Sequence, residues 1–268
     1  MDLLHEKYQH LKDYIRSLGS LAVGYSSGVD STLMLKVAHD VLGDKALAIT
    51  ATACWFPARE REEALEFCKQ EGIRHILVSV MADEIPGFRD NPPNRCYICK
   101  KALFTRIGEI AKEQGIAYIA EGSNMDDLGD YRPGLMAVSE LGVVSPLREA
   151  NLYKAEIRQL SQELGLPTWS KPSFACLASR FVYGETITDE KLNMVEQAEN
   201  WLMQKGYTQF RVRIHDRLAR IEVPPEQILS IAGLASEITP YFKQLGFLYV
   251  TLDLGGYKMG SMNLMINK

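Results

Sequence analysis

The residues from Ser26 to Ser31 combine hydroxyl groups, a glycine and a carboxylate in the order Ser-Ser-Gly-Val-Asp-Ser. They follow the apolar run Leu21–Val23 and precede the apolar segment Leu33–Ala38, so a buried strand, a tight loop and a helix are expected. The first N–H groups and the macrodipole of such a helix attract an anion. Hydroxyl and N–H groups suit the oxygens of a pyrophosphate, and Asp30 suits its divalent metal. The alternative is an ordinary strand–helix turn capped by Ser26 or Asp30.

The spacing of this loop resembles the Ser-Gly-Gly-x-Asp-Ser loop of the PP-loop ATP pyrophosphatases. Ser27 stands where that family usually has its first glycine. The Gly-Lys-Ser/Thr ending of a Walker A loop is missing, which favours cleavage of ATP to AMP and pyrophosphate over γ-phosphoryl transfer. The resemblance implies that ATP and Mg2+ bind here, with Mg2+ at Asp30. The residues expected at the pyrophosphate are Ser26, Ser27, Gly28, Asp30 and Ser31.

Three cysteines are candidates for sulfur or metal chemistry. Cys96 and Cys99 form a C-x2-C pair just before an expected helix, where thiolates are stabilised. Such a pair suits half a zinc site, a redox pair or two ligands of an iron–sulfur cluster, and the sequence offers no second close pair for zinc. Cys176 is the expected third ligand, and three thiolates leave one iron of a 4Fe–4S cluster open to sulfide. The alternative for Cys176 is a small buried side chain, as we also expect for Cys54 and Cys68.

Basic residues gather on one expected strand. Arg211, Arg213 and His215 alternate along it, so their side chains share one face. Neighbouring cations repel one another unless an acid or a bound anion compensates them. Glu222 on the next strand is one candidate compensator. The other is a substrate phosphate or carboxylate, in a site that Arg180 would complete.

Composition limits the classes of function. The 268 residues are 46% hydrophobic and 24% charged, which is typical of a globular protein with a core. The net charge of −4 argues against nucleic acid as the main partner, because that role needs a basic face. No apolar run approaches the ~20 residues that span a bilayer. The N-terminus lacks the pattern of a secretory signal, and the cysteines then predict a reducing, cytoplasmic location.

The first two thirds of the chain alternate between strand and helix patterns. Strands are expected at Leu21–Val23, Ala46–Thr52, Ile76–Val80 and Ala117–Ala120. Helices are expected from Leu4 to Leu18, and over Thr32–Leu42, Arg59–Gln70, Cys99–Gln114 and Pro146–Gly165. This order predicts an α/β fold, with helices on both faces of a parallel sheet. A ligand is expected beyond the carboxyl ends of the strands, where the loop from Ser26 falls.

After about Ser173 the pattern changes to a small α+β domain. Strands are expected at Phe210–His215, Ala219–Val223 and Tyr249–Leu254, the first two as an antiparallel pair. Helices are expected over Asp189–Lys205 and Pro225–Gln244. We therefore predict domains at residues 1–172 and 173–268.

Several motifs together resemble the LarE family, the ATP-dependent sulfurtransferases that build the nickel-pincer cofactor of lactate racemase. They are Ser26–Ser31, Gly129–Leu135, Cys176–Gly184, Arg211–Arg213, Ala219–Glu222 and Val250–Gly256. The resemblance covers nearly the whole chain. It implies a PP-loop domain followed by a substrate-binding domain, and a homo-oligomer.

The resemblance also implies a two-step reaction. ATP adenylates a carboxylate of pyridinium-3,5-biscarboxylic acid mononucleotide, and a sulfur nucleophile then forms a thiocarboxylate. Arg211 and Arg213 would hold the substrate phosphate. Glu199 would act near the site, although a solvated carboxylate on an amphipathic helix is its ordinary explanation.

The LarE family has two sources of sulfur. In one branch a single cysteine, matching Cys176, gives up its own sulfur. In the other, three cysteines hold a 4Fe–4S cluster that carries sulfur from sulfide or another donor, and Cys96 and Cys99 favour this branch. Rival interpretations are a PP-loop tRNA thiolase, an ammonia-dependent amide ligase and a nucleotide-binding regulator without catalysis.

Overall fold

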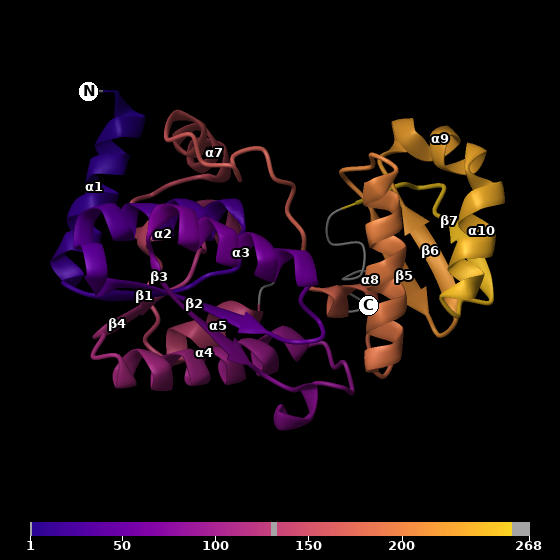
Figure 1. The fold of residues 1–268 in the computed structure, drawn as a ribbon, viewed down its shortest axis with the longest axis horizontal. Helices are drawn as coiled ribbons and strands as arrows, with labels where there is room; N and C mark the ends of the chain where they lie inside the picture. Colours follow the sequence, from indigo (N-terminus) through magenta and orange to yellow (C-terminus); the bar gives the residue numbers. More distant parts are fainter. Residues whose placement is uncertain (1, 130–132, 259–268) are drawn as a thin grey trace. The chain divides into compact units, whose positions relative to one another are not determined.

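The chain forms two compact units in a computed structural model that describes residues 2–129 and 133–258 (Figure 1). Unit 1 comprises the chain up to Ala53, Ala58–Ile85 and Cys96–Phe174. Unit 2 comprises Cys54–Pro57, Pro86–Arg95 and the chain from Ala175 onward. No helix among the described residues is long and apolar enough to cross a membrane.

Unit 1 contains a four-stranded parallel sheet in the order β3-β2-β1-β4. The strands are β1 (Leu21–Gly24), β2 (Ala46–Thr52), β3 (Arg74–Ser79) and β4 (Tyr118–Ala120). The first two are almost continuously apolar and buried, as strands covered on both faces must be. The strand order reverses at β1, and its carboxyl end is therefore the expected ligand-binding edge. The loop that begins at Ser26 follows directly.

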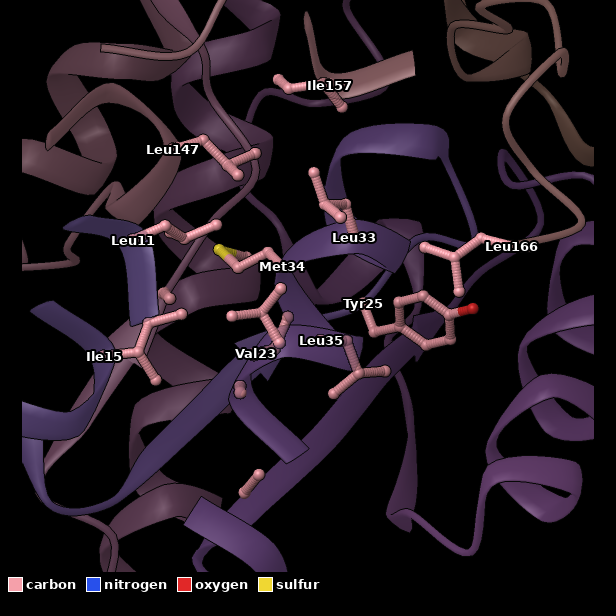
Figure 2. Packing of buried hydrophobic residues seen from close by; sticks show 14 of the residues in the cluster. Leu11, Ile15, Val23, Tyr25, Leu33, Met34, Leu35, Leu147, Ile157 and Leu166 are labelled. Atoms are coloured by element: carbon pink, nitrogen blue, oxygen red, sulfur yellow. The ribbon is translucent and has the colours of Figure 1, made fainter. Parts of the chain in front are cut away.

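Helices cover both faces of this sheet (Figure 1). On one face lie α1 (Leu3–Leu18), α2 (Val29–Leu42), α3 (Ala58–Glu71), α6 (Pro146–Glu149) and α7 (Lys154–Glu163). On the other lie α4 (Arg95–Glu113) and α5 (Pro133–Glu140). Figure 2 shows Leu11 and Ile15 of α1 packed with Val23 of β1 and Met34 of α2. Each such fully buried side chain contributes about 1.5–3 kcal/mol through the hydrophobic effect, which fixes α2 on the sheet.

Two helix starts differ from the sequence-based expectation. Helix α2 begins at Val29 rather than Thr32, so Asp30 belongs to its first turn. Helix α4 begins at Arg95 rather than Cys99, because the Arg95 N–H donates to the Pro92 carbonyl (2.8 Å) and closes a turn directly after the prolines. The C-x2-C pair therefore lies within the helix rather than before it.

The helix expected over Pro146–Gly165 is broken. Helices α6 and α7 are separated by Ala150–Tyr153, and Asn151 has a left-handed backbone (φ 53°), which asparagine tolerates better than most residues. The Lys154 N–H donates to Asp126 Oδ2 (2.7 Å). The break makes Lys154 the first residue of α7.

Unit 2 contains a three-stranded sheet in the order β5-β6-β7. Strands β5 (Arg211–His215) and β6 (Leu218–Glu222) are antiparallel, as expected, and β7 (Tyr249–Leu252) runs parallel to β6. Helix α8 (Asp189–Gln204) packs against β5, and α10 (Ala235–Gln244) packs against β7. The helix expected over Pro225–Gln244 is divided into a short 3-10 turn, α9 (Ile228–Gly233) and α10.

Segments from earlier in the chain complete unit 2. The Leu177 N–H donates to the Trp55 carbonyl (2.9 Å), and the Asn91 amide donates to the Val182 carbonyl (2.7 Å). Arg95 Nη1 donates to the Ala178 carbonyl (2.9 Å). The polypeptide around residues 177–182 is therefore hydrogen-bonded to residues 54–57 and 86–95.

Candidate active site

The serine loop, Ser26–Ser31, is closed by its own side chains. Ser31 Oγ lies 3.2 Å from Ser26 Oγ and donates to the Gly28 carbonyl (3.2 Å). Gly28 precedes α2 and has no side chain with which to cap the first N–H groups of the helix. These N–H groups lie at the positive end of the helix dipole, which is the arrangement that binds a phosphate.

Asp30 is held by two residues that follow β4. Its carboxylate forms an ion pair with Lys154 of α7, and Asn124 Nδ2 donates to Oδ1 (3.0 Å). The Asp30 side chain remains 20% exposed. Magnesium is usually bound by one or two carboxylates together with substrate phosphates, and an accessible carboxylate in the first turn of a phosphate-binding helix fits that donor set.

The end of β4 approaches this turn closely because Gly122 lacks a side chain. A Cβ atom there would lie 3.2 Å from the Ser31 nitrogen and 3.3 Å from Asp30 Cβ. Next to it, the buried Glu121 carboxylate accepts hydrogen bonds from Ser123 Oγ and Ser145 Oγ, both at 2.7 Å. The close approach places Asn124 within reach of Asp30.

Ser27 is the conformational exception in the loop. It is buried and has a left-handed backbone, with φ 52°. Lys171 Nζ donates to its carbonyl (3.0 Å) and forms an ion pair with Glu63 of α3. Ser27, the residue that departs from the PP-loop pattern, is thus the residue of the loop whose backbone is strained.

Cys96 and Cys99 lie three residues apart on α4 and share a face, with Cβ atoms about 5–6 Å apart by helix geometry. Cys96 is exposed and Cys99 is buried. Thiolates are the usual ligands of an iron–sulfur cluster, so the pair fits two of its positions. Among residues 2–129 and 133–258, no group of three or more His, Cys, Asp or Glu side chains is placed to hold a metal ion.

Two other cysteines have different surroundings. Cys68 is buried in the core of unit 1, as expected. The expectation that Cys54 is a core residue is wrong. Cys54 is exposed, and its Sγ donates to Asp189 Oδ1 (3.3 Å) of α8, because the chain leaves β2 at this point and enters unit 2.

In unit 2, Cys176 precedes a 3-10 turn, Leu177–Arg180, and is partly exposed. The Cys176 carbonyl accepts a hydrogen bond from Arg180 Nη1 (3.2 Å), as does the Ala175 carbonyl (2.7 Å). The backbone on both sides of the thiol is therefore fixed by one guanidinium.

That guanidinium is fully buried and paired with Glu199 of α8. Arg180 Nε and Nη2 donate to the two carboxylate oxygens, each at 2.8 Å, and Glu199 Oε1 also accepts the Val212 N–H (3.0 Å). Burial is the largest single influence on the pKa of Glu199 and raises it, but the charge and hydrogen bonds of Arg180, together with the Val212 N–H, outweigh burial and lower the pKa. The sequence-based view of Glu199 as a solvated carboxylate is wrong, since it is 1% exposed.

Arg211 and Arg213 lie on the same face of β5. Arg213 Nε and Nη2 donate to Glu222 Oε2 (3.0 and 2.9 Å), so the acid on the neighbouring strand does compensate it. Arg211 lies 5.0 Å from the centre of the Tyr257 ring. Burial, followed by the charge of Arg180, lowers the pKa of Arg211 to about 10. A bound anion would relieve that cost of holding the charge.

The structure gathers the expected site residues into two sets. Ser26–Ser31 stand in unit 1, as do Cys96 and Cys99, whereas Cys176 and the three arginines stand in unit 2. Asp130–Arg132, part of the family resemblance, lie outside the described residues. Sequence reasoning missed Lys154 and Asn124 as partners of Asp30. For Asn124 the signal was its place in Glu121–Asn124, directly after a strand that neighbours β1.

Two relatives match this chain over nearly their full length, and a third matches part of it. An uncharacterized protein of Synechocystis is 47% identical over 99% of this chain and 100% of its own length. Pyridinium-3,5-bisthiocarboxylic acid mononucleotide synthase of Lactiplantibacillus plantarum is 37% identical over 100% of this chain and 98% of its own. One subunit of the glutamine-hydrolyzing GMP synthase of Archaeoglobus fulgidus is 30% identical over 67% of this chain and 63% of its own. No family model matches the chain. The expected α/β fold with a PP-loop domain is confirmed.

Proposed function

The chain belongs to the family of the pyridinium-3,5-bisthiocarboxylic acid mononucleotide synthase, the LarE family, and from that premise we propose its reaction. It is an ATP-dependent sulfurtransferase that forms AMP and pyrophosphate. It converts the carboxylates of pyridinium-3,5-biscarboxylic acid mononucleotide to thiocarboxylates for the nickel-pincer cofactor. The observation that carries the proposal is the serine loop at the carboxyl end of β1, with Asp30 accessible in the first turn of α2.

The serine loop supplies the activating half of the reaction. Its N–H groups and the Ser26 and Ser31 hydroxyls bind the pyrophosphate of ATP. Asp30 would hold Mg2+, which offsets negative charge on the departing pyrophosphate. Lys154, already paired with Asp30, adds a second positive charge at the same place.

Unit 2 supplies the substrate-holding half. Arg211 and Arg213 bind the phosphate of the mononucleotide, and the lowered pKa of Arg211 supports an anion there. Arg180, predicted as a third phosphate ligand, instead supports the backbone of Cys176 through its buried pair with Glu199. We assign activation to the predicted domain 1–172, and substrate binding and homo-oligomer formation to 173–268.

Cys96, Cys99 and Cys176 are the proposed sulfur-delivering residues. Together they would hold a 4Fe–4S cluster, which would supply a bound sulfide for transfer. The alternative for the same reaction is that Cys176 gives up its own sulfur. Both routes require a reducing, cytoplasmic setting. The cluster route takes its sulfur from sulfide or another small-molecule donor, whereas in the other route the protein itself is consumed.

The test is an anaerobic reaction of the purified protein with ATP, Mg2+, the pyridinium mononucleotide and sulfide. Pyrophosphate release and a thiocarboxylate product are expected, and ammonia in place of sulfide should give no amide. Iron and sulfide analysis, with intact protein mass before and after turnover, separates the two sulfur sources. Loss of one sulfur from the polypeptide without bound iron would exclude the cluster route. A product without any pyrophosphate would exclude the proposed activation.

A further inference from the structure

Ser27 needs an external support for its backbone. Its φ of 52° is in the left-handed region, which glycine enters freely and L side chains rarely adopt. The PP-loop pattern has glycine at this position, and this chain has a serine that is buried. Contacts outside the loop must therefore keep Ser27 in that conformation.

Lys171 and Glu63 provide such contacts. Lys171 Nζ donates to the Ser27 carbonyl (3.0 Å) and lies 3.3 Å from Ser27 Oγ. Glu63 Oε2 forms an ion pair with Lys171 and accepts the Ser27 hydroxyl at 3.5 Å. The Lys171 side chain is only 17% exposed, so its charged hydrogen bonds are partly shielded from water. The three residues form a closed set around the strained peptide.

Lys171 is itself placed by α7. Arg158 donates to the carbonyls of Trp169 (2.6 Å) and Lys171 (2.8 Å), and the Lys171 N–H donates to the Thr168 carbonyl (3.0 Å). Arg158 follows Lys154 by four residues and shares its helix face. One face of α7 thus contacts Asp30 directly, and supports Ser27 through Lys171.

We propose that Lys171 and Glu63 are positioning residues that hold Ser27 left-handed, and so keep the serine loop in its phosphate-binding conformation. They replace the conformational freedom that glycine gives at this position. The proposal rests on the proposed function in one respect, namely that the loop binds the pyrophosphate of ATP. Its distinguishing feature is that the need for Lys171 depends on which residue occupies position 27.

The experiment measures binding of MgATP and of inorganic pyrophosphate to the full chain, together with KM and kcat for pyrophosphate release. Lys171→Met should weaken binding and raise KM roughly tenfold, with a smaller change in kcat. In a Ser27→Gly background the same substitution should change affinity by less than about twofold, because glycine needs no support. Lys36→Met is the matched control. Lys36 is 21% exposed and pairs with Asp40 and Glu71, and its loss should leave nucleotide affinity unchanged.

Two results would overturn the inference. One is unchanged affinity in Lys171→Met, and the other is an equal loss with serine or glycine at position 27, which would mean direct contact with the nucleotide. If Lys171→Met does not fold, Glu63→Gln takes its place in both backgrounds, since Glu63 is 47% exposed. A wild-type protein that binds neither MgATP nor pyrophosphate would contradict the proposed function instead.

Discussion

The serine loop of unit 1 and the arginine cluster of unit 2 (Arg180, Arg211 and Arg213 with Glu199 and Glu222) are both charged sites, but they are built in opposite ways. The serine loop uses backbone groups and small side chains, and in its Asp30–Lys154 ion pair the two side chains are 20% and 28% exposed. In the arginine cluster the paired side chains are at most 7% exposed. Water therefore reaches the ion pair of the serine loop, whereas the ion pairs of the arginine cluster are buried.

The difference in exposure of these ion pairs determines how much each one contributes to the stability of the fold. Ion pairs that water reaches contribute about 0–1 kcal/mol, so residues of the serine loop can serve a ligand at little cost to folding. Breaking a buried pair costs about 3–5 kcal/mol, because the remaining charge has lost both water and its partner. Substitutions in the serine loop should therefore lower ligand binding or activity, whereas substitutions that break a buried pair of the arginine cluster should lower the free energy of unfolding.

The largest expected effect is on the buried pair. Arg180→Met should lower the free energy of unfolding of unit 2 by about 3–5 kcal/mol, since it leaves the Glu199 carboxylate buried without its partner. Urea unfolding followed by circular dichroism measures the change. Arg106→Met, which breaks the exposed pair with Glu109, should leave unfolding unchanged. A loss below about 1 kcal/mol in Arg180→Met would show that this pair does not hold unit 2 together.

Asp30→Asn should lower activity and leave stability nearly unchanged, the opposite of what is expected for Arg180→Met. Pyrophosphate release should fall on the order of a hundredfold, because the amide carries no charge for the metal, while the unfolding midpoint changes little. Asp40→Asn, on the same helix and also paired with a lysine, is the control and should retain its rate. Full activity in Asp30→Asn would remove the carboxylate from the proposed activation.

A smaller effect is expected at Gly122. In Gly122→Ala the new methyl group would press on Ser31 and Asp30 at 3.2–3.3 Å, and MgATP affinity should fall severalfold, as measured by calorimetry. Gly233→Ala has nothing within 4 Å of the added Cβ and should leave affinity unchanged. Equal affinities for the two variants would mean that the serine loop yields to the methyl group without cost.

The smallest expected effect is a pH dependence of stability. Burial lowers the pKa of His75 in unit 1, and burial followed by the Arg220 charge lowers the pKa of His215 in unit 2. Each unfolded histidine therefore takes up its proton first as pH falls through about 6.5, and stability is lost from there down to the folded pKa. The slope for one proton stays below about 1.4 kcal/mol per pH unit.

Hydrogen exchange at pH 7.5 and 5.5 resolves this dependence for each unit. His75→Gln should flatten the pH response of unit 1 and His215→Gln that of unit 2, each without effect on the other. A slope that persists in both variants would assign the titration to other groups.

Much of the fold was predictable from the sequence, because hydrophobic periodicity reports burial directly. The amphipathic helix Leu3–Leu18, the strand Ala46–Thr52 and the antiparallel pair of β5 with β6 were all expected within a few residues. The serine loop was recognisable because its strand, turn and helix are contiguous in the chain.

What could not be predicted depends on contacts between distant residues. The sequence around a glutamate on an amphipathic helix does not show whether its side chain is buried. Glu199 is buried because it pairs with Arg180, which comes from a different segment of the chain. Lys154 meets Asp30 across 124 residues, and Lys171 meets Ser27 across 144. The break between α6 and α7 has a local cause, the left-handed backbone of Asn151. A single asparagine in the sequence is nevertheless too weak a signal to predict that a helix ends there.

The interleaving of the two units along the chain bears on how the gene can change. A single crossover at codon 175 would exchange most of unit 2, yet it would leave behind the Trp55 carbonyl and the Asn91 amide that bind Leu177 and Val182. Recombination between relatives would therefore pair residues 177–182 of one protein with residues 54–57 and 86–95 of another, unless these upstream segments were exchanged as well. The segment from Ala175 onward thus depends on the two upstream segments of unit 2 and is not a module that can be transferred alone.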